Sequence, residues 1–526
     1  MALPVNKTSL EKSPIYRLKG LKDRLVYPHP ELSPENCIVI SNINFSEKNL
    51  ASSRNGYEKY NTTVIPSSEP AVGFVEEEFA THGVKRLFCT PDKIYTDDGS
   101  TRTDITSSVS LSGSNDEYFM LDFVQDKIVG TNGKDNCFTW AGTGNAAAFT
   151  FSADSTVFTT AEDLVEHNNA LVVLVPTISS SKKNTRILWS DVNTKDFTGD
   201  ITRYPSNSRY EIGGENSSPI IGGVDNWGKL WIAKKDGIYP GKLEYNSGYI
   251  EYVPDEEVGN LRGFHPVSKT SLVARPEFIF GIAREGGYVI TPEGKFSIVT
   301  KDIDFQDTFN MDRLQYAVSS IREKEHQVRV LMSSAGNTTG HDLILSWDWE
   351  TGDVSIDKHE TTKMSYISNF FVSGVEFDLL AGYSSGFMYK SNTGTDDDGA
   401  SIQWVIETAP NDLGLPGVEK TIHNVVLFYR DVGTGPQSID FQLIRDEGIR
   451  GSRSRTIELG TDLQYDEGHT YDSALRYPGG GNDRKVWGCN RTALTAGFKI
   501  TGSSTVSLVG YQLWYTVDDT TANTAA

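Results

Sequence analysis

The stretch RILWSDVNTKDFTG, residues 186–199, decides the fold class. An aliphatic run reaches Trp189, turns over polar residues and returns to an aromatic at Phe197. The stretch DLILSWDWETGDVSI, residues 342–356, has the same form and turns at Thr351-Gly352-Asp353. Gly and Asp tolerate the positive φ that tight hairpin turns need. Both stretches therefore predict a repeated β-hairpin unit.

Segments of this kind recur along the chain at a regular spacing. They begin at residues 85, 127, 170, 229, 277, 327 and 371, which are 42 to 59 residues apart. Four short strands with their turns need about 40–50 residues in a propeller blade. The sequence thus predicts an all-β chain with an irregular β-propeller of about six to seven blades over residues 61–395. We expect the tryptophan of each hairpin to pack between neighbouring blades.

The dipeptide Trp347-Asp348 raises the alternative of WD40 repeats. A WD40 blade carries a Gly-His at a fixed offset before its Trp-Asp. Here Gly340-His341 stands only six residues earlier, and the other units have neither dipeptide. We therefore interpret the repeats as divergent blades of a structural propeller.

The two ends of the chain differ from the repeats in their sequence pattern. From residue 396 onward, strictly alternating runs such as SIQWVIETA predict an antiparallel β-sandwich platform over residues 396–518, followed by a flexible tail, residues 519–526. The first 60 residues hold few strand patterns and several prolines. We expect residues 1–60 to form an extended N-terminal arm.

Composition limits the classes of function. The 49 basic and 70 acidic residues give a net charge of −21, which opposes adhesion to nucleic acid or to anionic membranes. Four cysteines without a C-x-x-C pair predict free thiols. No apolar run approaches the ~18 residues that span a bilayer, and the first residues lack a signal peptide pattern. We expect a soluble protein that does not insert into membranes by itself.

No catalytic or cofactor-binding residues are predicted. The nine histidines are scattered, and the chain has no G-x-S-x-G elbow, P-loop or dinucleotide fingerprint. The segment TDDDGASIQW approaches the Asp-box of propeller sialidases, but Ile402 occupies its eighth position and Trp404 comes two residues late. We expect a protein that is not an enzyme, with a propeller-type glycoside hydrolase as an alternative.

Two charged clusters are weighed as sites. Asp396, Asp397 and Asp398 are weak candidates for a Ca²⁺ site, although the loop lacks the EF-hand order and a solvated turn is favoured. The arginines around RDEGIRGSRSRT are either a solvated loop or a docking patch for a neighbouring subunit, and both interpretations stay open. The candidate patch residues are Arg450, Arg453 and Arg455, near Arg445.

The order of these features resembles a known family. A proline-rich entry leads to Arg54-Asn55-Gly56-Tyr57; an irregular propeller follows, with its RILWSDV hairpin. The glycine-bracketed segment GYSSGFMYKSNTGTDDDGASIQW comes next, and a terminal sandwich ends in LVGYQLWYTV. In this order the chain resembles the tail-nozzle and packaged-DNA stabilisation proteins of short-tailed bacteriophages.

The resemblance implies a structural virion protein in the phage tail, assembled in the cytoplasm of the bacterial host. Such proteins form a homohexameric ring below an adaptor (head-to-tail connector) protein and carry fibre, spike or needle proteins. DNA is retained in the ring and ejected through its lumen without specific binding. Arg54, Asn55, Gly56 and Tyr57 would then be interface residues that anchor the arm. An alternative function is that of a receptor-binding or head-decoration β-propeller protein of a phage.

Overall fold

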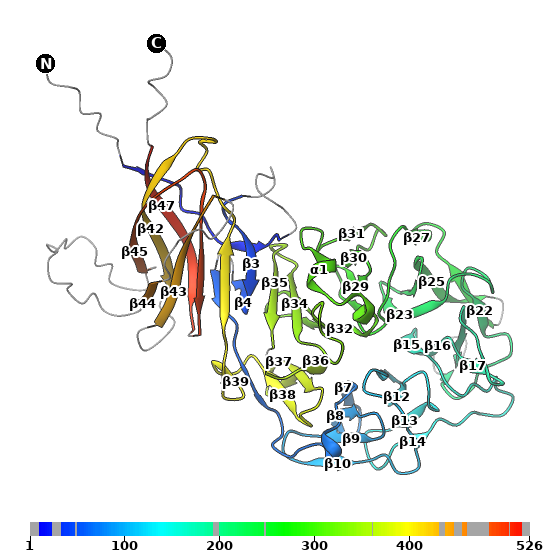
Figure 1. The fold of residues 1–526 in the computed structure, drawn as a ribbon. Helices are drawn as coiled ribbons and strands as arrows, with labels where there is room; N and C mark the ends of the chain where they lie inside the picture. Colours follow the sequence, from blue (N-terminus) through cyan, green and yellow to red (C-terminus); the bar gives the residue numbers. More distant parts are fainter. Residues whose placement is uncertain are drawn as a thin grey trace, which may run out of the picture.

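The computed structural model describes residues 10–23, 33–47, 50–192, 199–246, 249–359, 361–430, 437–446, 455–459, 483–503 and 505–517. Seven β-sheets, each built mainly from consecutive residues, form a β-propeller (Figure 1). The first strands of successive sheets contact one another in a closed circuit, which runs through β7, β11, β15, β23, β28, β32 and β36 and returns to β7. These strands therefore surround the propeller axis. The propeller predicted from the sequence is confirmed.

The blades are numbered 1 to 7 along the chain. Blade 1 contains β7 (Gly73–Phe79), β8 (Gly83–Cys89), β9 (Ile94–Asp97) and β10 (Arg102–Asp104), and blade 2 contains β11 (Met120–Val124), β12 (Lys127–Thr131), β13 (Phe138–Trp140) and β14 (Ala147–Ala148). Blade 3 contains β15 (Asp163–His167), β16 (Ala170–Leu174), β19 (Arg186–Trp189) and β22 (Arg209–Glu211), with side hairpins β17 (Thr177–Ile178) to β18 (Ser181–Lys182) and β20 (Asp191–Val192) to β21 (Gly199–Asp200).

The next three blades follow the same plan. Blade 4 contains β23 (Ile220–Asn226), β24 (Lys229–Lys234), β25 (Gly237–Asn246), β26 (Tyr249–Pro254) and β27 (Leu261–Arg262). Blade 5 contains β28 (Val273–Ala274), β29 (Ile279–Ala283), β30 (Gly286–Ile290) and β31 (Phe296–Ile298), and blade 6 contains β32 (Val318–Arg322), β33 (Gln327–Met332), β34 (Leu343–Asp348) and β35 (Val354–Lys358). Short helical turns are η1 (Pro66–Ser68), α1 (Phe305–Thr308) and η2 (Met311–Tyr316).

Local sequence explains the hairpins. The first hairpin of several blades turns over two residues that both have positive φ, the geometry that matches the twist of the flanking strands. Buried apolar strands such as β16, ALVVL, follow these turns. The turn pairs are Gln125-Asp126, Asn168-Asn169, Trp227-Gly228 and Ser373-Gly374.

The tryptophans lie where the sequence predicts. Trp189 belongs to one core with residues of blades 3 and 4. Trp347 of blade 6 meets Phe278 of blade 5 edge-to-face and stacks on Phe280, with ring centroids 5.3 and 6.0 Å apart. Packing between adjacent blades is therefore confirmed for both.

Blade 7 closes the ring with residues from both sides of the propeller. Its strands β36 (Met364–Val372), β37 (Val375–Gly382) and β38 (Met388–Ser391) are completed by β6 (Tyr57–Lys59), which pairs with β38. The short strands β39 (Asp396–Asp397) and β40 (Ala400–Ser401) extend this sheet. The propeller therefore includes residues 57–59 and 396–401, which the sequence-based boundaries assigned to the arm and to the sandwich.

The remaining strands form two six-stranded sheets, which we call the two-sheet unit. One sheet has the order β4 (Ile43–Glu47), β5 (Leu50–Ser53), β47 (Ser507–Val517), β42 (Lys420–Arg430) and β45 (Asp483–Ala493), with β1 (Glu11–Lys12) on β47. The other has the order β2 (Lys19–Leu21), β3 (Asn36–Ser41), β41 (Trp404–Thr408), β46 (Ala496–Gly502), β43 (Gln437–Arg445) and β44 (Arg455–Leu459). Phe498 meets Tyr511 at 4.7 Å, and Phe441 stacks on Trp487 at 4.2 Å, so side chains of both sheets share one core.

The predicted extended arm is wrong for the described residues 10–23, 33–47 and 50–60. Strands β1 to β5 lie in both sheets, where Ile40 pairs with Ile406 and Ser52 pairs with Ser507. Ile406 and Ser507 lie more than 360 residues away from these partners in the sequence, so no local pattern predicts the two pairings. Residues 519–526, the predicted tail, lie outside the described residues.

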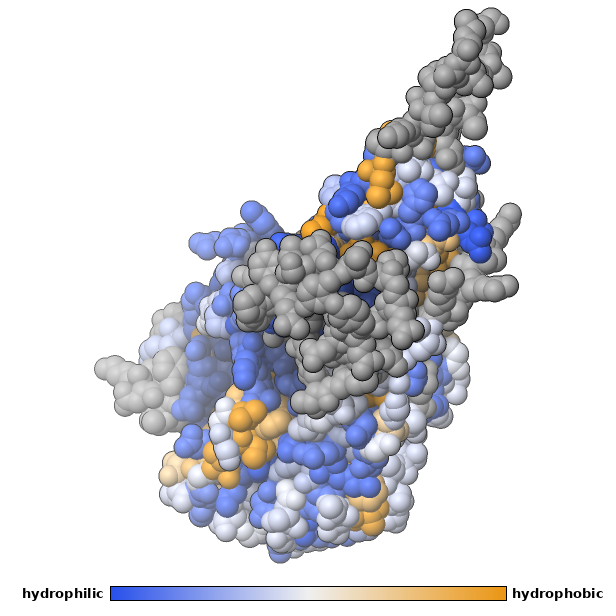
Figure 2. All heavy atoms as spheres, turned by 90° about the vertical axis from the view of Figure 1, so that its left-hand side faces the viewer, coloured by the Kyte–Doolittle hydropathy of each residue, from blue (hydrophilic) through white to orange (hydrophobic). Residues whose placement is uncertain are grey.

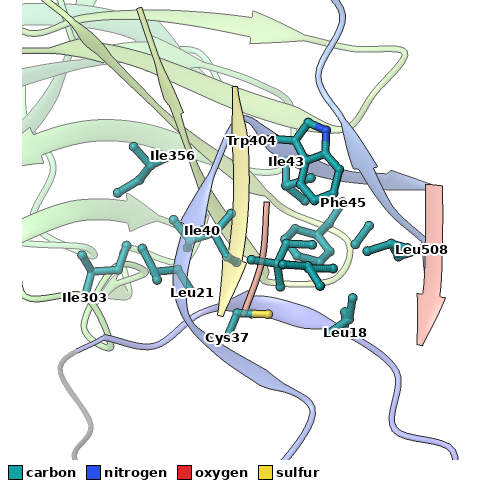
Figure 3. Close-up of a cluster of buried hydrophobic side chains, with 14 of the residues drawn as sticks. Leu18, Leu21, Cys37, Ile40, Ile43, Phe45, Ile303, Ile356, Trp404 and Leu508 are labelled. Atoms are coloured by element: carbon teal, nitrogen blue, oxygen red, sulfur yellow. The ribbon is translucent and has the colours of Figure 1, made fainter. Parts of the chain in front are cut away.

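The two-sheet unit packs directly on the propeller. Strands β2, β3 and β4 contact β35 of blade 6, and Figure 3 shows Leu21 and Ile40 facing Ile303 and Ile356 across this contact. Gly20 lets the backbones meet, because a Cβ there would come within 2.6 Å of the Val354 nitrogen. One continuous apolar core thus joins both parts. In the described residues no helix is long and apolar enough to cross a membrane.

Candidate functional site

The chain passes from the two-sheet unit to the propeller at Arg54. Arg54 is only 6% exposed, and its side chain makes a bidentate ion pair with Asp397, with N–O distances of 2.7 and 2.5 Å. Its Nε donates to Asn42 Oδ1 at 2.9 Å. The contacts of Arg54 are therefore within the chain, where they link β5, blade 6 and blade 7.

The residues after Arg54 complete this crossing. Asn55 donates its amide to Asn392 Oδ1, and Tyr57 is buried at the start of β6. Gly56 lies so close to blade 7 that a Cβ would meet the Asp396 carbonyl oxygen at 1.7 Å. Contact of this turn with another subunit stays a prediction.

The three aspartates that are weak candidates for a Ca²⁺ site all bind other residues of the same chain. Asp397 pairs with Arg54, Asp398 pairs with Lys59 at 3.0 Å, and Asp396 accepts a hydrogen bond from the Gly399 nitrogen at 2.6 Å. The described part of the chain brings together no group of three or more His, Cys, Asp or Glu that could hold a metal ion. Asp397 and Asp398 thus join segments of the chain through ion pairs, and Asp396 stabilises a turn.

The predicted arginine patch falls largely beyond what the structure describes. Arg450 and Arg453 lie outside the described residues, and Arg455 begins β44 without a described side chain. Arg445 donates to the Thr492 carbonyl at 3.2 Å. A docking role for this patch stays a prediction.

A buried ion network surrounds the crossing, and we call it the seam network. Arg329 reaches Asp378 at 2.5 Å and Asp357 at 2.9 Å, so it ties blade 6 to blade 7. Arg322 pairs with Glu325 at 2.8 Å and lies 3.7 Å from Asp378. Buried charges of this kind are tolerated when each is paired.

The titration behaviour of the seam network follows from burial. Burial raises the pKa of Asp357, and the guanidinium groups of Arg329 and Arg54 oppose that rise. Burial and the same two cations hold the pKa of His359 well below its usual range. His359 is therefore a neutral imidazole inside the protein.

A second candidate site is a cavity of about 530 Å³, which we call the mouth cavity. Its walls include residues at or shortly before the start of the axial strands of blades 2 to 6, so it opens at one end of the propeller axis. A cavity of this size suits a small ligand or a short peptide segment. Its polar and aromatic wall residues include Asp116, Glu117, Tyr118, Asn132, Glu162, Lys182, Asn184, Lys235, Lys269, Gln315 and Tyr316.

Each carboxylate in the wall of the mouth cavity has a cationic partner. Asp116 pairs with Arg313 at 2.7 Å, and Glu117 pairs with Lys134 at 3.5 Å. Glu162 pairs with Lys182 and lies 3.7 Å from Lys269. Lys235 is exposed in the same wall and makes no described ion pair. The wall itself thus holds three lysines, Lys182, Lys235 and Lys269, against three carboxylates, in a chain that is acidic elsewhere.

A hydrogen-bonded chain of Tyr118, His341 and Ser333 lies behind this wall. His341 bonds Tyr118 Oη and Ser333 Oγ, each at 3.0 Å, and none of its surface is exposed. Burial lowers the pKa of His341 to about 3. A general base needs contact with substrate and a pKa near the working pH. The arrangement therefore fits a structural role.

Sequence reasoning missed a device that links neighbouring blades. Asp122 of β11 accepts from the Glu166 nitrogen of blade 3, and Asp163 of β15 accepts from the Gly223 nitrogen of blade 4 at 2.8 Å. Burial raises the pKa of each carboxyl to about 7. An Asp within an axial strand, as in MLDFV and DLVEH, is the sequence signal that could have identified them.

No family model matches the chain, and no curated protein matches it. Among solved structures, it is similar to the WD40 domain of Pan2 from Neurospora crassa, with a TM-score of 0.38 and 11% identity over 66% of this chain and 97% of that one. It is also similar to the WD40 β-propeller domain of Doa1, with a TM-score of 0.35 and 8% identity over 64% of this chain and 97% of that one. At these values the likeness says nothing about function.

These neighbours correct the resemblance drawn from the sequence. They are WD40 propeller domains and not tail-nozzle proteins, so the assignment to that family is wrong. The physical reason is that a run of hairpins followed by more strands describes an architecture that many unrelated functions share. The order of features could specify a propeller but not a family.

Proposed function

We propose that this chain is a structural subunit that holds other protein chains in place and does not turn over a substrate. The observation that supports this best is the seam network together with the continuous core beneath it. Buried ion pairs and shared apolar packing make the propeller and the two-sheet unit a single stiff body. Such a body suits a load-bearing or spacing role.

We further propose that the two-sheet unit is the β-sandwich platform expected from the sequence and that it carries the assembly contact. Within the described residues, the eleven-residue strand β45 has β42 as its sheet partner, and its other edge is open. Open edges are natural sites for pairing with another chain. Figure 2 shows a mainly hydrophilic face with separate apolar patches, which fits contacts made by a few local areas.

The finer expectations accompany this proposal as predictions. They are a closed homo-oligomeric ring with six subunits, attachment of adaptor and of fibre, spike or needle proteins, passage of DNA through the lumen without specific binding, and a place in a virion. A head-to-tail contact that closes by rotation would produce such a ring. The net charge of −21 per chain supports passage of DNA without adhesion.

The test of the structural proposal is the mass of the purified protein in solution, by light scattering coupled to size exclusion. We expect a defined homo-oligomer that Val486→Arg on β45 dissociates. The matched control is Val375→Arg, because Val375 is similarly exposed, at 48% against 43%, but lies on a propeller hairpin. A wild-type chain that stays monomeric at high concentration, or equal effects of both variants, would contradict the proposal.

The mouth cavity favours a second candidate function, the binding of an acidic segment of a partner protein. Its three lysines, of which Lys235 makes no described ion pair, and its amide and tyrosine side chains suit the carboxylates of an acidic peptide. Anisotropy of a labelled hexaglutamate peptide should show salt-sensitive binding that Lys235→Glu weakens at least threefold. Lys324→Glu, at an exposed lysine on the hairpin between β32 and β33, should leave it unchanged. Absence of binding would remove this candidate while leaving the structural proposal intact.

A further inference from the structure

A small cavity lies inside the seam network, beside the Arg54–Tyr57 crossing. Its walls come from β4, blade 6 and blade 7, so both parts of the molecule contribute to it. Its volume of about 10 Å³ gives room for roughly one water-sized particle. The wall residues are Asn44, Arg54, Asn55, Gly56, Tyr57, Arg322, Arg329, His359, Leu380, Ser391 and Asn392.

Polar atoms without a hydrogen-bond partner in the described protein gather around this cavity. Four of the five residues that carry them are almost fully buried, since Arg322 is 3%, Arg329 6%, His359 2% and Ser391 4% exposed, and Asn44 is half-buried. A buried polar group without a partner destabilises the folded state, so a cluster of them points to a bound species. The atoms are Asn44 Oδ1, Arg322 Nε, Arg329 Nε, His359 Nδ1, His359 Nε2 and Ser391 Oγ.

The chemistry of these atoms defines the occupant. Arg322 Nε and Arg329 Nε can only donate, Asn44 Oδ1 can only accept, and the Ser391 hydroxyl can do either. His359 is a neutral imidazole, so one of its nitrogens donates and the other accepts. The occupant must therefore both accept and donate hydrogen bonds.

We propose that this cavity binds one water molecule that bridges the two-sheet unit to blades 6 and 7. The water accepts from an arginine Nε–H and from the Ser391 hydroxyl, and it donates to Asn44 Oδ1 and to the free nitrogen of His359. Buried waters in proteins make about three such bonds.

Neither a halide nor a metal cation fits the same walls. A halide would leave Asn44 Oδ1 and one His359 nitrogen unsatisfied, because it cannot donate. The surrounding carboxylates Asp357, Asp378, Asp397 and Glu325 also outnumber the guanidinium groups of Arg54, Arg322 and Arg329. A cation would instead meet the N–H groups of Arg322 and Arg329 in the cavity wall.

The bridging role follows from where the partners lie. Asn44 is on β4 of the two-sheet unit, Arg322 and Arg329 are on blade 6, and Ser391 ends β38 of blade 7. The ion pairs of the seam network use the terminal nitrogens of both arginines, so the water completes the hydrogen bonding of the guanidinium group whose Nε–H it accepts. A bound water, together with the ion pairs, thus holds the two-sheet unit to blades 6 and 7.

The direct test is a crystal structure of the full chain grown in sodium bromide at a resolution that orders solvent. We expect a solvent peak within hydrogen-bond distance of Arg322 Nε or Arg329 Nε and of Asn44 Oδ1, without anomalous signal at the bromine edge. An anomalous peak there would show a halide site and overturn the proposal. A cavity without density would overturn it as well.

A pair of serine variants gives a second test in solution. Ser391→Ala removes a water partner and should lower the unfolding midpoint by about 1–3 °C. The control is Ser346→Ala on blade 6, because Ser346 is equally buried and its hydroxyl also lacks a partner, but it does not line the cavity. The control should leave the midpoint unchanged or raise it, since it deletes an unsatisfied group. Equal behaviour of both variants would overturn the assignment of Ser391 to the site.

Discussion

The propeller and the two-sheet unit are both all-β, but they are built from opposite kinds of contact. Within blades 1 to 6, hairpins join residues that are neighbours in the chain, such as His167 and Ala170 across a two-residue turn. In the two-sheet unit, β3 pairs with β41 and β5 pairs with β47, across more than 360 residues. Closing such long loops costs entropy that local hairpins avoid. The propeller can therefore form blade by blade, whereas the two-sheet unit needs both chain ends at once.

The largest effect should come from removing the N-terminal strands. Deleting residues 1–53 takes β1 to β5 from both sheets and leaves β6 to close blade 7. We expect limited proteolysis to cut the exposed strands between residues 404 and 517 while the propeller stays protected. Adding a peptide of residues 10–53 should restore protection. A truncated chain with unchanged protection would show that the C-terminal strands fold alone.

The next effect concerns the joint between the two regions. Arg54→Ala leaves Asp397 buried without its cation, which should cost about 3–5 kcal/mol in urea unfolding. The double variant Arg54→Leu with Asp397→Leu should recover much of that loss, because no unpaired charge remains. If Arg54→Ala were neutral, the ion pair would not hold the joint.

A smaller loss of stability should follow from adding a methyl group at Gly56, in the Arg54–Tyr57 crossing. Gly56→Ala places a methyl group against the Asp396 carbonyl, so the backbone must shift, at a cost of about 1–3 kcal/mol. Gly336→Ala is the matched control, because a Cβ there meets nothing within 4 Å and its φ is not positive. Thermal unfolding of both variants would measure the difference. Equal midpoints would contradict the close approach of β6 and β39.

The smallest effect is the pH dependence of stability that Asp163 contributes to the propeller. The folded pKa of Asp163 is raised to about 7, above its ordinary value of 3.8. The folded state therefore holds this proton to higher pH than the unfolded state does, so its stabilising contribution is complete below pH 4 and is lost as pH rises toward 7. Asp163→Asn keeps an acceptor for the Gly223 nitrogen and cannot ionise.

Urea titrations of wild type and Asp163→Asn at several pH values would measure this contribution. We expect the stability difference to move in favour of the variant between pH 4 and pH 7. His341, with its pKa lowered to about 3, changes stability in the opposite direction as pH falls from about 6.5, but it is common to both proteins. A difference that does not vary with pH would contradict the raised pKa.

Prediction from sequence succeeded where an element and its partner share a short stretch. The hairpin turns, the blade spacing and the inter-blade position of Trp189 and Trp347 follow from residues within one or two blades. It failed for β1 to β5, whose prolines and short runs gave no pattern, and for the Arg54–Tyr57 crossing, which has a structural use that spacing could not reveal. The seam network also escaped notice, since Arg54, Arg329 and Asp397 lie far apart in the chain.

The sequence by itself determined a repeated hairpin, an acidic charge and a chain rich in strands, because these depend on local periodicity and composition. Only the tertiary structure decided that the two ends of the chain share two sheets and that β6 closes blade 7. It also decided that Asp163 is buried against blade 4 and that His359 is buried beside the seam arginines. The physical reason is that pairing and burial between distant residues depend on the packing of whole sheets. A pattern within one strand records which face is apolar, but not which strand from elsewhere in the chain will cover it.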